Sequence, residues 1–109
     1  IDLTTRTFKT HSIPDTVLHM YLGGKGLGTH LLLSHTPDRP VEAFDPRNPI
    51  IFTIGPLAGL KVHGSSRYGV YTRSPQTGIY SESYSGGKVA LSMAQCGVDA
   101  FLLQGASDP

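Results

Sequence analysis

The chain has 109 residues, a hydrophobic content of 39% and a formal net charge of +1 at pH 7. This length suits one small domain with a modest core, and the composition is typical of an ordered globular protein. The near balance of charges argues against a nucleic-acid-binding protein, and no apolar run approaches the roughly 20 residues of a membrane span. Cys96, the single cysteine, excludes an internal disulfide and a cysteine metal cluster, and favours a reducing, cytoplasmic compartment.

The first residues predict two short strands followed by a helix. Weak alternation on either side of a turn predicts strands over 1–5 and 7–11. Pro14 and Asp15 suit a first helical turn, and we expect the helix to end at Gly23-Gly24. Its apolar face would be formed by Val17, Leu18, Tyr21 and Leu22.

Further elements follow without regular alternation of strands and helices. We expect a helix over 27–33, a loop over 37–49, strands over 50–54, 68–73 and 79–84, a helix over 88–95 and a strand over 99–104. This order predicts an α+β fold: a mixed sheet with a few short helices. The chain begins with Ile1 and stops just after an apolar run, so we expect residues 1–109 to be part of a longer chain.

A glycine cluster over 23–28 stands where the second helix should begin. Glycine is roughly 1 kcal/mol less favourable than alanine inside a helix, so such a cluster suggests a gain elsewhere. Bare amides at a helix start can hold an anion, and Lys25 between Gly24 and Gly26 would suit a phosphate. The alternative is a tight helix–helix corner that needs positive φ angles.

A second glycine cluster, Gly86-Gly87, precedes the helix expected over 88–95. Ser85 can cap that helix, and the two glycine amides carry no obstructing side chain. This pattern again predicts an anion site, here with a phosphorylated ligand. The alternative is a strand-to-helix turn that simply packs tightly.

Arg67 is the third candidate binding group, because guanidinium recognises phosphate through two parallel hydrogen bonds. A lone arginine is more often a solvated surface residue. The five histidines form no ligand pair, and the tyrosines at 68, 71, 80 and 84 are interpreted as cross-strand packing. The glutamates Glu42 and Glu82 stand alone, so the segment offers binding groups without a catalytic acid–base pair.

Taken together, these motifs resemble the N-terminal domain of the tungsten-containing aldehyde ferredoxin oxidoreductases, in the family's order and nearly end to end. They are IDLTT at 1–5, YLGGKGLG at 21–28, NPIIFTIGPLAG at 48–59, SRY at 66–68, TRSPQTG at 72–78, SGG at 85–87 and CGVDA at 96–100. The resemblance implies the first half of a duplicated, cofactor-cradling N-terminal domain. It also implies a full-length enzyme that oxidises aldehydes to carboxylic acids and passes electrons to ferredoxin.

The same resemblance implies cofactors and positions for them. The metal would be tungsten or molybdenum, held by two pterins whose phosphates meet at magnesium, with a [4Fe-4S] iron–sulfur cluster whose ligands lie outside this segment. By position, Arg67 would lie between pterin and cluster, and Ser85-Gly86-Gly87 would meet the pterin phosphates and magnesium. The loop holding Gly24, Lys25 and Gly26 would be the domain's other glycine loop. The remaining domains of the chain would be partners, and a homo-oligomer is compatible with this assignment.

Two departures from the family pattern bear on the site. Tyr84 stands where asparagine usually precedes Ser-Gly-Gly, so a magnesium contact there would need its backbone carbonyl. Lys25 stands where arginine is common, which keeps the charge and loses the planar fork. Two other hypotheses stay open from the residues alone: a non-catalytic binding module for a phosphorylated metabolite, and a purely structural domain with glycine-rich corners.

Overall fold

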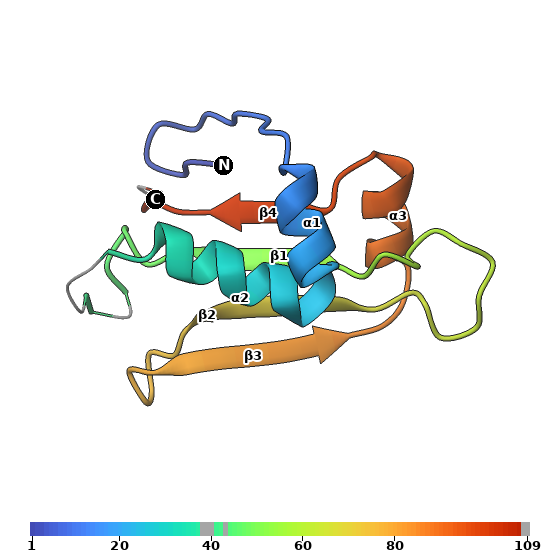
Figure 1. Ribbon diagram of the computed structural model, residues 1–109. Helices are drawn as coiled ribbons and strands as arrows, with labels where there is room; N and C mark the ends of the chain where they lie inside the picture. The colour runs from blue at the N-terminus through green and yellow to red at the C-terminus, as the bar shows by residue number, and fades with distance from the viewer. Residues whose placement is uncertain (38–40, 43, 108–109) are drawn as a thin grey trace.

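The computed structural model describes residues 1–37, 41–42 and 44–107, which form one sheet with helices on both of its faces (Figure 1). The sheet has four strands in the order β3-β2-β1-β4. The elements in chain order are α1 (Asp15–Tyr21), α2 (Gly24–His35), β1 (Ile50–Ile54), β2 (Tyr68–Arg73), β3 (Tyr80–Ser85), α3 (Val89–Gln95) and β4 (Ala100–Leu103). The predicted α+β class is confirmed, and the strands and helices expected after residue 48 lie within about one residue of their predicted bounds.

The sheet pairs antiparallel at every strand junction, whereas the sequence suggested a mixed sheet. Strand β1 lies between β2 and β4, with Ile51 opposite both Tyr71 and Leu102. The only parallel pairing within the described residues is an isolated bridge between Asp2 and Gln104.

Alternation along the strands divides the apolar side chains between two faces of the sheet. On one face, Ile51 and Tyr71 pack with Leu32 of α2. On the other, Ile54 packs with Ala90 and Met93 of α3. The polar segment over 80–85 is a strand that is mostly exposed, because it forms the edge of the sheet beyond β2.

The predicted strands over 1–5 and 7–11 are wrong, since this segment makes only single bridges. The Asp2 carboxylate accepts hydrogen bonds from the amides of Thr4 and Thr5, at 2.9 and 3.0 Å. These bonds close a tight turn in which Arg6 has a φ of 54°. A side chain that satisfies local amides in this way removes them from a strand ladder.

The helices differ from their expected bounds around the first glycine cluster. Leu22 has a φ of 63° and is 68% exposed, so it ends α1 and does not join the apolar face predicted for it. Helix α2 begins at Gly24, three residues before the expected start. The loop predicted over 37–49 falls partly on residues 38–40 and 43, which lie outside the described residues.

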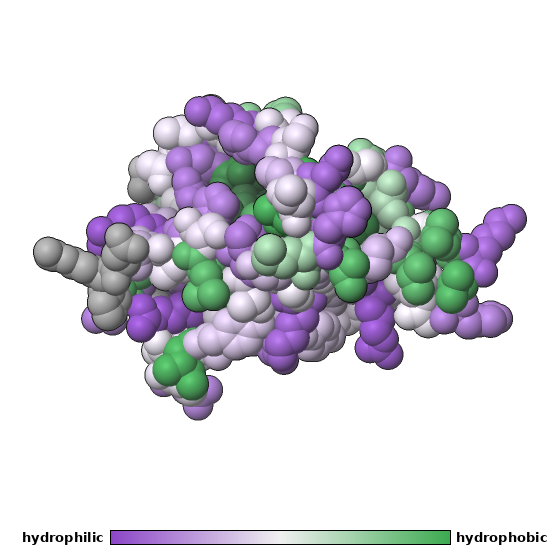
Figure 2. Space-filling view, viewed as in Figure 1, coloured by the Kyte–Doolittle hydropathy of each residue, from purple (hydrophilic) through white to green (hydrophobic). Residues whose placement is uncertain are grey.

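Apolar side chains gather on the surface at the end of the molecule opposite the chain termini, on the right of Figure 2. This end carries the long connection between β1 and β2 (Figure 1), where Leu57, Leu60 and Val62 are at least half exposed. No helix in the described part of the chain is long and apolar enough to cross a membrane.

Candidate functional site

A hollow of about 300 Å³ lies where β1 and β3 end and β2 and α2 begin, at the same end of the sheet (right side of Figure 1). Three of the predicted site residues, Gly24, Arg67 and Tyr84, line it together. The other lining residues are Thr53, Gly55, Pro56, Leu57, Ala58, Ser65, Tyr68, Gly69 and Tyr71. Segments separated by up to 60 positions in the sequence thus meet at one concave surface.

A side-chain hydrogen bond joins the start of α2 to the sheet beside this hollow. Gly23 and Gly24 have φ angles of 134° and 51°, which reverse the chain between α1 and α2. The buried Thr53 hydroxyl donates a hydrogen bond to the Gly24 carbonyl at 2.7 Å. The first amides of a helix have no partner within it, so the start of α2, where Gly24 lines the hollow, carries partial positive charge.

Two other glycines of the first cluster are required by packing. A Cβ at Gly26 would lie 2.5 Å from the Tyr21 carbonyl oxygen, and one at Gly28 would lie 2.3 Å from the Tyr71 ring. Neither residue lines the hollow. The positive φ angles that the helix–corner alternative requires are found at Gly23 and Gly24, while close packing explains Gly26 and Gly28. Gly24 also lines the hollow, and an anion site there stays a prediction.

Lys25 does not face the hollow as an available cation. Its ammonium pairs with the Glu82 carboxylate of β3 at 2.9 Å, with the two side chains 61% and 29% exposed. The hydrogen bond from Lys25 lowers the pKa of Glu82, helped by a second one from the Tyr80 hydroxyl. Lys25 thus neutralises an acidic group near the hollow, a role that its place in the glycine cluster did not predict.

Arg67 immediately precedes β2 and lines the hollow. Its side chain is exposed, and within the described residues its guanidinium makes no hydrogen bond or ion pair. The preceding residue joins this strand to the second glycine turn, because the Ser66 hydroxyl donates to the Gly87 carbonyl. The only arginine of the hollow is therefore unengaged and close to both predicted loops.

The second glycine cluster is open to solvent beside the hollow. Ser85 is the last residue of β3, and the residue before α3 is Lys88, which makes no side-chain capping bond. The predicted Ser85 cap is thus wrong, because pairing with β2 holds Ser85 in the sheet. Gly87 has a φ of 92°, and the nearest atom to a Cβ at Gly86 would be the Ser66 carbonyl oxygen, at 3.9 Å.

Tyr71, interpreted from sequence as packing, also lines the hollow. Its side chain is 0% exposed, yet its hydroxyl forms no hydrogen bond. Burial raises the pKa of Tyr71 to about 12, so the group stays a protonated donor. Leaving a buried donor unpaired costs about 1–3 kcal/mol. Strand alternation in the sequence could have predicted that Tyr71 lies on the sheet face toward α2. Only the fold shows that the absence of side chains at Gly28 and Gly69 leaves space for the Tyr71 side chain.

The interpretation of the tyrosines as cross-strand packing is otherwise confirmed. The Tyr71 ring lies 6.5 Å from that of Tyr80 and 6.1 Å from that of Tyr84, both on β3. Tyr68 faces the other side of the sheet and stacks with Phe52 at 6.2 Å. Tyr84 is 48% exposed and stands opposite Gly69 in the register, so it forms one wall of the hollow.

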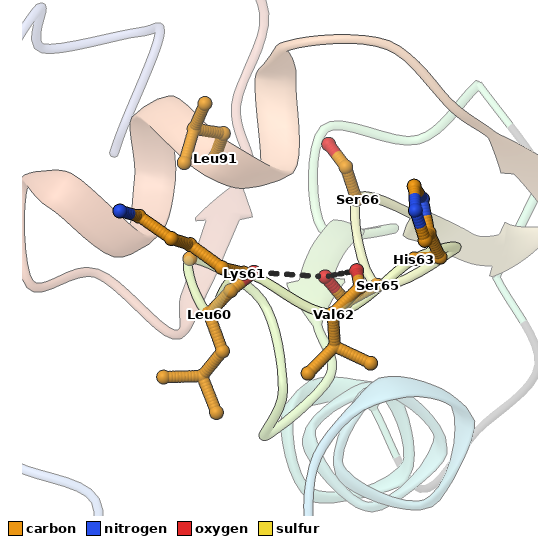
Figure 3. Close-up of a pocket in the computed structure, with 8 residues that line it drawn as sticks. Leu60, Lys61, Val62, His63, Ser65, Ser66 and Leu91 are labelled. Atoms are coloured by element: carbon orange, nitrogen blue, oxygen red, sulfur yellow. Dashed lines mark hydrogen bonds between the residues drawn. The ribbon is translucent and has the colours of Figure 1, made fainter.

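A second hollow, of about 330 Å³, lies between the β1–β2 connection and α3 (Figure 3). The Ser65 hydroxyl hydrogen-bonds to the carbonyls of Leu60 and Val62 and folds the connection on itself. In Figure 3, Leu60 and Val62 point away from Leu91 of α3, and Lys61 extends outward. The lining of this hollow contains none of the predicted site residues.

The described residues contain no cluster of three or more histidine, cysteine, aspartate or glutamate side chains that could hold a metal ion. A metal contact here would rely on backbone oxygens, as predicted for the Tyr84 carbonyl. That contact stays a prediction. Arg67, the start of α2 at Gly24 and three tyrosines line a concave surface whose lining contains no carboxylate.

Comparison with known proteins identifies the family. The whole chain, residues 1–109, matches the profile of the aldehyde ferredoxin oxidoreductase N-terminal domain, and the chain belongs to this family. It is 34% identical over 108 residues to a tungsten-containing aldehyde ferredoxin oxidoreductase of Pyrococcus abyssi, and 33% identical over 108 residues to one of Thermococcus kodakarensis. Each alignment covers 99% of this chain and 18% of the relative.

A solved structure shows the same fold. The active-site complex BamBC of benzoyl coenzyme A reductase, determined with 1,5-dienoyl-CoA, superposes with a TM-score of 0.92 at 34% identity. The match covers 98% of this chain and 16% of that chain. A more distant relative is the aliphatic sulfonate oxidoreductase WOR-like subunit of Pyrococcus furiosus, 24% identical over 107 residues. The chain therefore spans less than a fifth of the length of these relatives.

Proposed function

We propose that this chain is the first half of the cofactor-cradling N-terminal domain of a tungsten or molybdenum oxidoreductase. The full-length protein would oxidise aldehydes to carboxylic acids and pass the electrons to ferredoxin. The segment 1–109 would bind the pterin cofactor and take no catalytic part itself. The observation that carries the proposal is the hollow in which Gly24, Arg67 and Tyr84 meet, in a chain whose relatives are named tungsten-containing enzymes.

The chemistry of the hollow fits a phosphorylated ligand. Arg67 supplies the positive charge, and the helix start at Gly24 adds partial positive charge from its amides. The acidic neighbour Glu82 is already paired with Lys25, so it opposes an anion less. The turn at Gly86 and Gly87 is open and adjacent, which would let it contact a second phosphate of the same ligand.

The cofactor, when bound, would supply the two-electron redox chemistry, and the chain would supply position and electrostatics. Arg67 would offset phosphate charge at the side facing the iron–sulfur cluster. The Tyr84 carbonyl would contribute to magnesium. The ligands of the cluster, the substrate pocket and the ferredoxin contact would belong to the remaining domains of the chain.

The direct test is elemental analysis of the full-length protein, expressed with tungstate or molybdate and purified without oxygen. We expect tungsten or molybdenum, together with pterin that can be quantified by fluorescence after oxidative release. A full-length protein that holds neither metal nor pterin would refute the proposal. If it then bound a phosphorylated metabolite, the binding-module alternative would take its place.

Arg67→Ala tests the residue with the clearest role. Loss of the guanidinium from the hollow should lower the pterin content per polypeptide several-fold. Arg47→Ala is the matched control, because Arg47 pairs with Asp45 at 2.7 Å and lies outside the hollow. Equal pterin content in both variants would assign Arg67 to the surface.

A further inference from the structure

The buried hydroxyl of Tyr71, a residue that lines the hollow, has no hydrogen-bond partner. The chain makes room for this side chain at two separate places. A Cβ at Gly69 would lie 2.0 Å from the Tyr71 hydroxyl oxygen, and one at Gly28 would lie 2.3 Å from the ring. A phenylalanine would fill the same space without burying an oxygen.

The hydroxyl is buried and makes no hydrogen bond. It lies over Gly69, and both residues line the hollow with Gly24 and Arg67. The side chains of Thr53 and Tyr84 lie near enough to affect its pKa. Thr53 donates its own proton to the Gly24 carbonyl, and no hydrogen bond joins its hydroxyl to that of Tyr71.

We propose that Tyr71 is a ligand-binding residue whose hydroxyl donates a hydrogen bond to an anionic oxygen of the phosphorylated ligand seated against Arg67. This inference rests on the proposed function and adds a residue that the sequence motifs did not single out. The hydroxyl stays protonated at neutral pH, because burial holds its pKa far above that range. It can therefore act as a donor, and an oxygen held by Arg67 is an acceptor within the same hollow.

The test uses Tyr71→Phe in the full-length protein, with two separate measurements. The first is the rate at which pterin is lost from the loaded protein during dilution, quantified by fluorescence. We expect loss about tenfold to a hundredfold faster than in the wild type, as for a missing hydrogen bond to a charged group. The second is the thermal midpoint of the cofactor-free protein, which should be unchanged or raised, because the removed hydroxyl makes no hydrogen bond.

Tyr80→Phe is the matched control, since its hydroxyl lies on the same sheet face outside the hollow. That hydroxyl is hydrogen-bonded to Thr29 at 3.0 Å and donates to Glu82 at 2.8 Å. We expect the reverse pattern: a lower midpoint for the cofactor-free protein and an unchanged rate of pterin loss. Tyr71→Phe that lowers the midpoint and leaves pterin loss unchanged would show a packing role and overturn the inference.

Binding of inorganic pyrophosphate to the cofactor-free protein, measured by calorimetry, distinguishes the source of the phosphate. One outcome is that the wild type holds no pterin but binds pyrophosphate, and that Tyr71→Phe weakens this binding. The pterin proposal would then fail, and the inference would hold for a free phosphorylated metabolite. A second outcome is that the wild type holds pterin and that Tyr71→Phe retains it equally well. This result would overturn the present inference and leave the proposed function intact. Absence of both pterin and pyrophosphate binding would overturn both.

Discussion

The Tyr71 ring occupies the space that Gly28 leaves open between α2 and the sheet, where a Cβ would come within 2.3 Å of it. Both residues are buried, and Tyr71 lies in the same cluster as Leu32 and Ile51. The contact sets the separation of helix and sheet at the point where the hollow begins. The position of α2, and with it the Gly24 end of the site, thus depends on a glycine that does not line the hollow.

Gly28→Ala should destabilise the protein by about 1–3 kcal/mol, because the added methyl group overpacks a closed contact. Chemical unfolding of the full-length protein measures this change. Gly55→Ala is the control, since no atom lies within 4 Å of its Cβ position and its φ is not positive. In Gly28→Ala/Tyr71→Val the loss should be smaller than the sum of the single losses, and strict additivity would contradict the contact.

Thr53→Val should lower stability by about 1 kcal/mol and also speed pterin loss, because it removes the hydrogen bond that fastens Gly24 to β1. Thr72→Val is a matched control with a similar bond, from its hydroxyl to the Pro49 carbonyl at 2.9 Å, outside the hollow. Thr72→Val should lower stability without changing the rate of pterin loss. If both variants lose pterin at the same rate, the Thr53 bond has no particular role in the site.

Lys25→Ala should reduce pterin content because it exposes the hollow to the unpaired charge of Glu82. The double variant Lys25→Ala/Glu82→Gln should recover most of that content, since it removes the carboxylate as well. Measurement at two salt concentrations checks the electrostatic origin, because screening should shrink the difference. Equal loss in the single and double variants would mean that Lys25 contacts the ligand directly.

The Asp45 carboxylate should add stability that disappears in acid. Hydrogen bonds from the Arg47 side chain and amide lower the pKa of Asp45 from 3.8 to about 2. A group whose pKa is lower in the folded state stabilises the protein above the unfolded pKa and loses this effect as pH falls toward the folded one. The thermal midpoint of Asp45→Asn should therefore lie below the wild type at pH 6, and the difference should shrink between pH 4 and 2. A constant difference across this range would contradict the assignment.

Local patterns predicted most elements after residue 48, because strand alternation and the helix start after Gly86-Gly87 are properties of neighbouring residues. The same reasoning failed at residues 1–11, where Asp2 bonds to nearby amides in place of a strand ladder. It also misjudged Ser85 as a helix cap, since the competing partner lies across the sheet at Tyr68. Both errors concern a choice between a local and a distant hydrogen-bond partner.

The residue types needed to hold a phosphate, and the family itself, were visible in the linear order of Gly24, Arg67 and Ser85-Gly86-Gly87. Only the tertiary structure shows which of these groups share a surface. Gly24 and Arg67 line the same hollow, whereas Lys25 pairs with Glu82. Gly26 and Gly28 are required by close packing. It also brought Thr53 and Tyr71 to the hollow. The sequence of a glycine motif is the same whether the absent side chain leaves room for a ligand or for a neighbouring ring. Only the packing of α2 on the sheet distinguishes the two.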